Sequence, residues 1–341
     1  MSALSADENV TAQLKAFVQD KDAFSSNTWR QLLSVMRVCY HWTKENRRTF
    51  LPMTDADLRD YLNHLQSSGK ASSTIATHAS LISMLHRNAG LVPPNSSPVV
   101  FRAIRRINRM AVVGGERTGQ AVPFRFADLM KLDDLWVNSS LLREKRNLAF
   151  LHVAYNTLLR ISELSRLRVR DITQADDGRI ILDVAWTKTV VQTGGLIKAL
   201  STLSTQRLME WVLVSGLAAE PDAFLFCPVH RSNKAIVIAD RPLTTPVFET
   251  IFAQAWRAAG NSESAKRNKN RYSGWSGHSA RVGAAQDMAK QGYAVAQIMQ
   301  EGTWKKPETL MRYIRKVDAH QGAMVDLMEA EYPGNQGLRR G

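Results

Sequence analysis

The feature that most limits the possible folds is an abrupt end to helical periodicity between Ala111 and Pro123. This segment reads AVVGGERTGQAVP, with two adjacent glycines, a third glycine and a proline, which is typical of a connection between domains. At 341 residues the chain is long enough for two domains that each bury a core. We therefore predict an N-terminal domain over 1–113, a linker over 114–123 and a second domain over 124–341.

The N-terminal domain shows a helical pattern throughout. Apolar residues recur every three or four positions, and Thr54 with Asp57 three residues later matches the capping pattern of a helix N-terminus. We predict helices from about 10 to 20, from Ser25–Asn27 to Tyr40, from Thr54 to Leu65, from Ser72 to Gly90 and over 98–110.

The second domain has a mixed pattern. β-branched residues at 179–184 and 190–200 flank Thr187-Lys188-Thr189, which predicts a small antiparallel sheet with Lys188 near its turn. The predicted fold class is mainly α with this small antiparallel β-sheet. Helices are predicted at about 126–137, 140–159, 161–167, 204–215, 244–259, 278–291, 293–301, 306–315 and 322–330.

Charge narrows the class of partner. The chain holds 45 Lys and Arg against 31 Asp and Glu, a net charge of +14, and both halves are basic. A moderate surplus often serves only solvation, but a basic balance in both halves favours a polyanionic partner, most simply nucleic acid. Composition alone leaves open whether that partner is only bound or chemically changed.

Other features exclude several classes. No apolar run approaches the roughly 18–20 residues that span a bilayer, so we expect no membrane protein. The N-terminal MSALSADENV is polar and acidic, so we expect no secretory signal. Cys39 and Cys227 lie far apart without metal-ligand spacing, which argues against a disulfide scaffold or zinc site and fits a reducing cytoplasm.

Two cationic positions stand out in the second domain. His278 and Arg281 lie three residues apart in SGHSAR, where a predicted helix begins, so both project from its first turn. A helix N-terminus already favours anions, and an imidazole and a guanidinium there would make a phosphate clamp. Arg160 follows a strongly apolar helix, with Glu163 placed to orient it. Taken singly, each pair is more often an ordinary surface feature.

The remaining candidates are also ambiguous when taken alone. Lys188 in a turn is usually only solvated, and Trp304 and Tyr313 are usually core aromatics. Pro307 suits the first turn of a helix that would place Tyr313 about two turns in.

Together these residues are far more informative than separately. The candidates Arg160, Lys188, His278–Arg281, Trp304 and Tyr313, in this order, resemble the active-site set of the tyrosine site-specific recombinases of the phage integrase family. The resemblance includes the spacing of Arg281 and Tyr313, which are 32 positions apart. The stretches AYNTLLRISELSRLRV, GERTGQA, HRSNKA, SGHSARVGAA and MQEGTWKKPETLMRYIR carry the resemblance, which extends from about residue 20 to 328.

The resemblance implies a role for each residue. A phosphodiester repels nucleophiles and has a poor leaving group. Arg160, Arg281 and His278 would stabilise its non-bridging oxygens, with the Trp304 indole N–H as a further donor. The family resemblance makes Lys188 the general acid and Tyr313 the nucleophile, while Glu163 would orient the site.

The implied product is a 3′-phosphotyrosyl link with a free 5′-hydroxyl. Because this exchange conserves ester bonds, no ATP, metal or other cofactor is expected, and the chain carries no phosphate-binding loop. The resemblance further implies double-stranded DNA with inverted-repeat sites as partner, a homotetramer on two sites with a dimer on each, and exchange through a Holliday junction. The helix at 322–330 would pack on a neighbouring protomer or fold back on its own domain; the pattern leaves both open.

Several residues are candidates for DNA contacts. Four arginines recur at helical spacing in a region without acidic residues between 61 and 115, which favours phosphate contact. A basic loop at 266–271 is a similar candidate, and Arg231 and Lys234 are weaker ones. The resemblance places base reading on three helices. The complete set is Arg30, Gln31, Ser73, Thr77, Arg102, Arg105, Arg106, Arg109, Arg231, Lys234, Thr245, Glu249 and Arg271.

The chain departs from the resemblance at three base-reading positions. A family member has Lys, Gln and Arg where this chain has Ser73, Thr77 and Pro246, and proline cannot make the bidentate guanine contact of an arginine. We therefore expect the family's chemistry on a different target sequence.

Three alternatives remain open at this point. A topoisomerase of type IB shares this chemistry, a catalytically silent DNA-binding regulator shares the affinity, and a helical scaffold for proteins shares the fold class. The helical N-terminal domain argues against a topoisomerase, and the intact catalytic set argues against a silent regulator. The basic charge argues against a protein scaffold.

Overall fold

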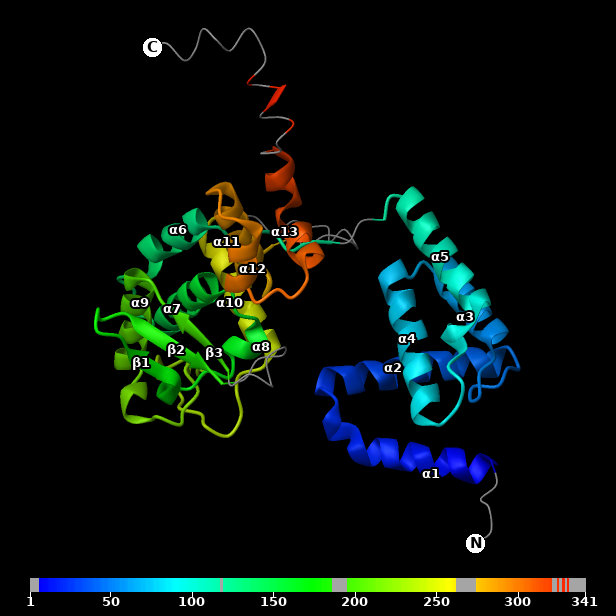
Figure 1. Cartoon of the computed structure of the whole chain (residues 1–341). Coiled ribbons are helices and arrows are strands. Elements are labelled where there is room, and N and C mark those ends of the chain that lie inside the picture. Colours follow the sequence, from blue (N-terminus) through cyan, green and yellow to red (C-terminus); the bar gives the residue numbers. More distant parts are fainter. Residues whose placement is uncertain are drawn as a thin grey trace. The chain divides into compact units, whose positions relative to one another are not determined.

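The computed structural model describes residues 6–116, 119–185, 195–261 and 274–320, together with residues 324, 327, 328 and 330. The chain divides into two compact units, Met1–Thr118 and Gly119–Gly341, coloured blue to cyan and green to red in Figure 1. Among the described residues, no helix combines the length and apolar character needed to cross a bilayer.

Unit 1 is helical. Its helices are α1 (Ala6–Gln19), α2 (Ser26–Glu45), α3 (Asp55–Ser67), α4 (Ser72–Asn88) and α5 (Pro98–Val113), with short 3-10 turns at Asp20–Ala23 and Pro94–Ser96. The cap predicted at the start of α3 is confirmed, because Thr54 Oγ1 accepts a hydrogen bond from Asp57 N at 3.1 Å. The apolar faces meet in a core around Leu58, Tyr61 and Ile82, all buried.

Unit 2 combines helices with one small sheet. The helices are α6 (Phe126–Trp136), α7 (Leu142–Thr157), α8 (Ile161–Leu164), α9 (Thr202–Val214), α10 (Thr245–Ala258), α11 (Ser279–Lys290), α12 (Val295–Glu301) and α13 (Pro307–His320). The antiparallel sheet has the order β1 (Ile172–Gln174), β2 (Ile180–Val184), β3 (Leu196–Ala199), with Thr173 opposite Ile181 and Ile181 opposite Ala199. The mainly helical fold class is therefore confirmed.

The sequence prediction missed β1. This strand has three residues, none of them buried, so it leaves no alternation of apolar and polar positions to detect. Of the predicted segment 190–200, residues 196–199 form β3, and the turn with Lys188 lies outside the described residues. Most of the helix predicted at 322–330 lies outside them as well.

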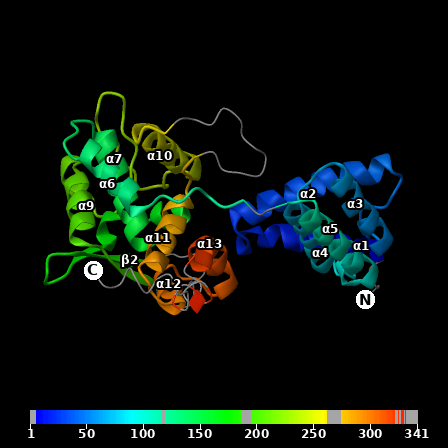
Figure 2. The same cartoon turned by 90° about the horizontal axis from the view of Figure 1, so that it is seen from above.

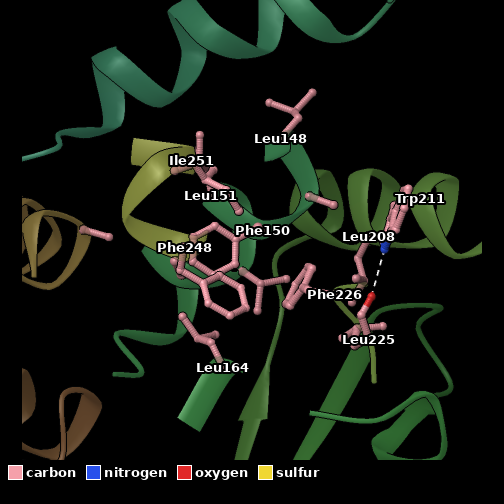
Figure 3. Packing of buried hydrophobic residues seen from close by; sticks show 14 of the residues in the cluster. Leu148, Phe150, Leu151, Leu164, Leu208, Trp211, Leu225, Phe226, Phe248 and Ile251 are labelled. Atoms are coloured by element: carbon pink, nitrogen blue, oxygen red, sulfur yellow. Dashed lines mark hydrogen bonds between the residues drawn. The ribbon is translucent and has the colours of Figure 1, made fainter. Parts of the chain in front are cut away.

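The core of unit 2 centres on α7, which is buried on nearly every side. Phe150 packs against Phe226 and Phe248 with ring centroids 5.3 and 4.8 Å apart, and Trp211 Nε1 donates to Leu225 O at 2.8 Å (Figure 3). Burying each large apolar side chain stabilises the fold by about 1.5–3 kcal/mol. This packing holds the C-terminal end of α7, where Arg160 follows, in one place.

A second apolar cluster lies between α11, α12 and α13, which are neighbours in both views (Figures 1 and 2). It contains Leu158, Ala285, Ile298, Trp304 and Leu310. This cluster joins the end of α7 to the helices that carry His278–Arg281 and Tyr313.

Candidate active site

The site begins where α7 ends. Leu158 adopts a left-handed conformation with φ 54° although it is buried and not a glycine. Such a conformation costs on the order of 1 kcal/mol for a residue with a Cβ. It turns the chain directly from α7 into α8 and aims the Leu158 carbonyl at Arg281.

Arg160 stands at the N-cap of α8 and is held by Glu163. Arg160 Nη1 donates to Glu163 Oε1 at 3.0 Å, and the backbone N–H of Arg160 donates to Glu163 Oε2 at 2.8 Å. Glu163 is 1 % exposed, so its carboxylate is screened little by water and fixes both the main chain and the side chain of Arg160. The guanidinium, partly exposed, keeps donors for a ligand.

Arg281, on the first turn of α11, is only 3 % exposed. Its guanidinium donates to the carbonyls of Leu158 and of Gly302, the latter at 2.8 Å, and lies over the Trp304 ring at 4.7 Å. Burial, together with the charge of Arg160, lowers the pKa of Arg281 to about 10. Arg281 therefore remains a cation at neutral pH, in a fixed orientation.

His278 forms the N-cap of α11 and is exposed. Partial desolvation and the charges of Arg281 and Arg160 lower the pKa of His278 below its usual value. The imidazole is therefore mainly neutral at neutral pH and can accept a proton.

The backbone beside His278 is tightly packed. A Cβ on Gly277 would lie 1.9 Å from Ile161 Cδ1, so a larger residue there would require the Ile161 side chain to move. Gly277 N donates to Glu249 Oε2 at 3.0 Å. Glu249, which we predicted to contact DNA, is thus engaged with the loop that carries His278.

Trp304 and Tyr313 complete the cluster. Their rings lie edge to face with centroids 5.7 Å apart, and Trp304 is buried. A Cβ on Gly302 would lie 1.9 Å from Trp304 Cζ3, so glycine is required for this close approach. Tyr313 is half-buried on α13 and lies close enough to interact electrostatically with Arg281. Beyond the indole donor that the sequence analysis assigned to Trp304, the structure shows its ring supporting Arg281.

The structure brings six of the seven candidates for catalysis together. Arg160, Glu163, His278, Arg281, Trp304 and Tyr313 form one cluster built from α8, α11, α13 and the turn before α13. Lys188 lies outside the described residues.

The DNA-contact candidates are mostly at the surface. On α5 the four arginines are exposed on the side opposite Val100, Ala103 and Ile107. Thr77 is half-buried and donates to Ser73 O at 2.9 Å, and Arg271 lies outside the described residues. The exposed candidates are Arg30, Gln31, Ser73, Arg102, Arg105, Arg106, Arg109, Arg231, Lys234 and Thr245.

Two glutamines that the sequence analysis did not select contact the site. Gln286 Nε2 and Gln120 Nε2 donate to the backbone carbonyl of Tyr313 at 2.9 and 3.0 Å. The signal available for Gln286 was a long polar side chain directly after the apolar run Val282–Ala285, five residues after Arg281. Gln120 lies in the stretch GERTGQA, which carries part of the family resemblance, but nothing in that stretch assigned it a role.

Residues 129–320 match the family described as "Phage integrase family". Recombinase cre of Escherichia phage P1 is 43 % identical over 322 residues, covering 94 % of this chain and 93 % of that protein. The fold and the site thus define an enzyme of the tyrosine recombinase class, which carries out site-specific recombination. The chain belongs to the phage integrase family.

Solved structures show the same fold. The Tn1549 transposon integrase in complex with transposon right end DNA has a TM-score of 0.60 at 14 % identity, with 92 % of this chain and 99 % of that chain covered. The XerH site-specific recombinase bound to palindromic difH substrate has a TM-score of 0.56 at 14 % identity, with 94 % and 85 % covered.

Proposed function

We propose that Tyr313 attacks the scissile phosphate of a DNA strand and forms a 3′-phosphotyrosine, releasing the 5′-hydroxyl. One P–O ester bond forms as another breaks, so the exchange is reversible by a 5′-hydroxyl of a second duplex and needs no energy source. The observation that carries this proposal is the buried, doubly anchored guanidinium of Arg281 beside the Tyr313 phenol.

The two arginines supply charge where the phosphorane develops it. Arg281 is held by two carbonyls and the Trp304 ring, and Arg160 is held by Glu163, so neither must reorganise during the reaction. His278, mainly neutral, is suited to receive the phenol proton or to donate an N–H to a phosphate oxygen. We assign Lys188 the proton transfer to the departing 5′-oxygen, on the strength of the family resemblance.

A suicide duplex tests this proposal directly. A nick just downstream of the scissile phosphate lets the short fragment with the free 5′-hydroxyl diffuse away, so a covalent adduct accumulates and is retained on a denaturing gel. The wild type should form the adduct, and Tyr313→Phe should form none while keeping its affinity for DNA. An adduct that still forms with Tyr313→Phe would overturn the assignment of Tyr313 as the nucleophile. A catalytically silent regulator would form no adduct, either as the wild type or as Tyr313→Phe.

The partner we propose is double-stranded DNA with two inverted half-sites. The relative from phage P1 is a recombinase, and the XerH structure contains a palindromic substrate. On this chain the exposed arginines of α5 suit phosphate contacts, which makes binding fall steeply with salt. We further propose that a dimer binds each site and that two sites assemble into a tetramer. Strands are then exchanged through a Holliday junction, in the cytoplasm.

The target sequence should differ from that of the phage P1 relative. Ser73, Thr77 and Pro246 present short or non-donating groups, which cannot make bidentate contacts with bases. Selection for cleavage from a library of randomised half-sites should return a different consensus. Recovery of the relative's unmodified site would contradict this expectation, and relaxation of a plasmid without a site would favour topoisomerase activity instead.

A further inference from the structure

The main-chain carbonyl of Tyr313 accepts hydrogen bonds from two side chains outside α13. Gln286 on α11 donates from Nε2 at 2.9 Å, and Gln120 donates from Nε2 at 3.0 Å. Gln120 belongs to the first residues of unit 2, far from Gln286 in the sequence. Two separate segments therefore converge on a single oxygen atom of the residue that carries the phenol.

The orientation of the Gln286 amide is fixed by its other partner. Gln286 Oε1 accepts from Arg125 Nη2 at 2.6 Å. A guanidinium only donates, so the oxygen must face Arg125 and the amide nitrogen must face Tyr313. Gln286 is 6 % exposed, which makes both bonds costly to lose.

Arg125 is itself anchored. Its Nη1 donates to Asp287 Oδ1 at 3.0 Å, and Asp287 Oδ2 accepts from Phe126 N at 2.8 Å and from Tyr155 Oη at 2.7 Å. The amide that holds Tyr313 is thus tied through Arg125 and Asp287 to α6 and α7.

The segment that carries Gln120 is also pinned to α11. Phe124 N donates to Ser279 O at 3.0 Å, and a Cβ on Gly283 would lie 1.7 Å from Phe124 O. Backbone packs directly on backbone here, which only glycine allows. Residues 120–125 are therefore held against the same helix that carries Arg281.

We propose that Gln120 and Gln286 are positioning residues for the nucleophile, holding the main chain of Tyr313 so that its phenol lies in line with the phosphate that Arg281 binds. The proposal rests on the function proposed above, because it takes Tyr313 as the attacking group. Neither amide contacts DNA in this scheme; both act through Tyr313. Displacements of about 1 Å at a reacting atom can cost up to about a hundredfold in rate.

Replacing either glutamine by glutamate keeps the size of the side chain but removes the N–H group that donates to the Tyr313 carbonyl. In Gln286→Glu, one oxygen still accepts from Arg125 while the other faces the Tyr313 carbonyl without a proton to donate. Gln120→Glu makes the same change at a half-buried position, where loss of folding is not expected. Gln206→Glu, on the exposed surface of α9, adds the same charge away from the site and serves as the control.

Single-turnover adduct formation at saturating enzyme should slow by about tenfold in each glutamate variant of the contact. DNA affinity and the thermal unfolding midpoint of Gln120→Glu should match those of Gln206→Glu. A purely structural role would lower affinity or stability together with the rate.

A substrate with sulfur at the bridging 5′-position separates nucleophile placement from leaving-group protonation. The thiolate leaving group needs no proton, so Lys188→Ala should regain adduct formation on this substrate. Gln120→Glu and Gln286→Glu should not recover, because their defect lies at the attacking oxygen. The proposal would be overturned, given a wild type that forms its adduct, by either of two results. One is that both glutamate variants recover adduct formation on the sulfur substrate, and the other is that both form the adduct at the wild-type rate on the ordinary substrate. If the wild type forms no adduct, the function proposed for Tyr313 fails instead.

Discussion

The two units differ in the kinds of polar groups that they bury. In unit 1, buried histidines pair with neutral neighbours: Tyr61 Oη lies 2.8 Å from His78 Nδ1, and His86 accepts from Met53 N at Nε2 (2.9 Å) and lies 2.8 Å from Ile82 O at Nδ1. In unit 2, charged groups are buried and gathered, as Arg281 and Glu163 are around the site. Neutral pairs stabilise a fold at little cost, whereas a buried charge is expensive unless it is paired or hydrogen-bonded. The residues that we propose for catalysis all belong to unit 2.

The sharpest test of this contrast removes the most deeply buried charge of the site. Arg281→Lys keeps a cation but replaces five donors in a planar fork by three on one nitrogen, so at most one donor would remain for a phosphate beside the bonds to Leu158 O and Gly302 O. We expect adduct formation to fall by about 10²–10³, as when a preorganised donor is lost from an oxyanion site. Adduct formation on a suicide duplex and DNA affinity measure this. Arg179→Lys, at an exposed surface pair, should cleave normally.

The second test concerns a charged network of unit 2 outside the site. Asp133 accepts from Arg207 Nε and Nη2 at 2.5 and 2.6 Å and lies 2.9 Å from His152 Nε2, all largely buried. Asp133→Asn leaves Arg207 without its counter-ion, which should lower the free energy of unfolding by about 3 kcal/mol. Urea unfolding measures the loss.

The matched control for Asp133→Asn is Asp177→Asn. Asp177 forms an ion pair with Arg179 at the protein surface, where both side chains are about half exposed. We expect no measurable change in stability, because water screens such a pair. Equal losses in the two variants would refute the role given to burial.

The smallest effect is the pH dependence of unit 1. Burial lowers the pKa of His86 and of His78 below their usual values, so the unfolded chain binds more protons than the folded unit. Their contribution to stability is complete above the unfolded pKa of about 6.5 and declines as the pH falls below it, by at most about 1.4 kcal/mol per pH unit for each histidine.

His86→Gln should reduce this slope, because the amide can donate to Ile82 O and accept from Met53 N without titrating. His41→Ala, at an exposed position, should keep the wild-type slope. Urea unfolding between pH 7.5 and 5, followed by the NMR signals of unit 1, measures both. A steeper loss in His86→Gln than in the wild type would contradict the account.

Most of the fold was open to prediction because its signals are local. The helices of both units follow apolar periodicity and capping residues such as Thr54, which act within one or two turns. β1 escaped because a three-residue strand with no buried side chain is defined by its partner β2 and not by its own pattern. Gln120 escaped for a similar reason, because its partner is a backbone carbonyl nearly two hundred residues away.

The sequence by itself determined the chemistry to look for: a phenol, two guanidiniums and an imidazole in a fixed order, on a basic chain with helical units. Only the tertiary structure decided how these groups are held. Leu158 and Gly302 offer their carbonyls to Arg281, and Glu249 accepts the N–H of Gly277. In each of these bonds one partner is a main-chain carbonyl or N–H, which nearly every residue possesses, so residue identity cannot reveal the pairing until the chain is folded.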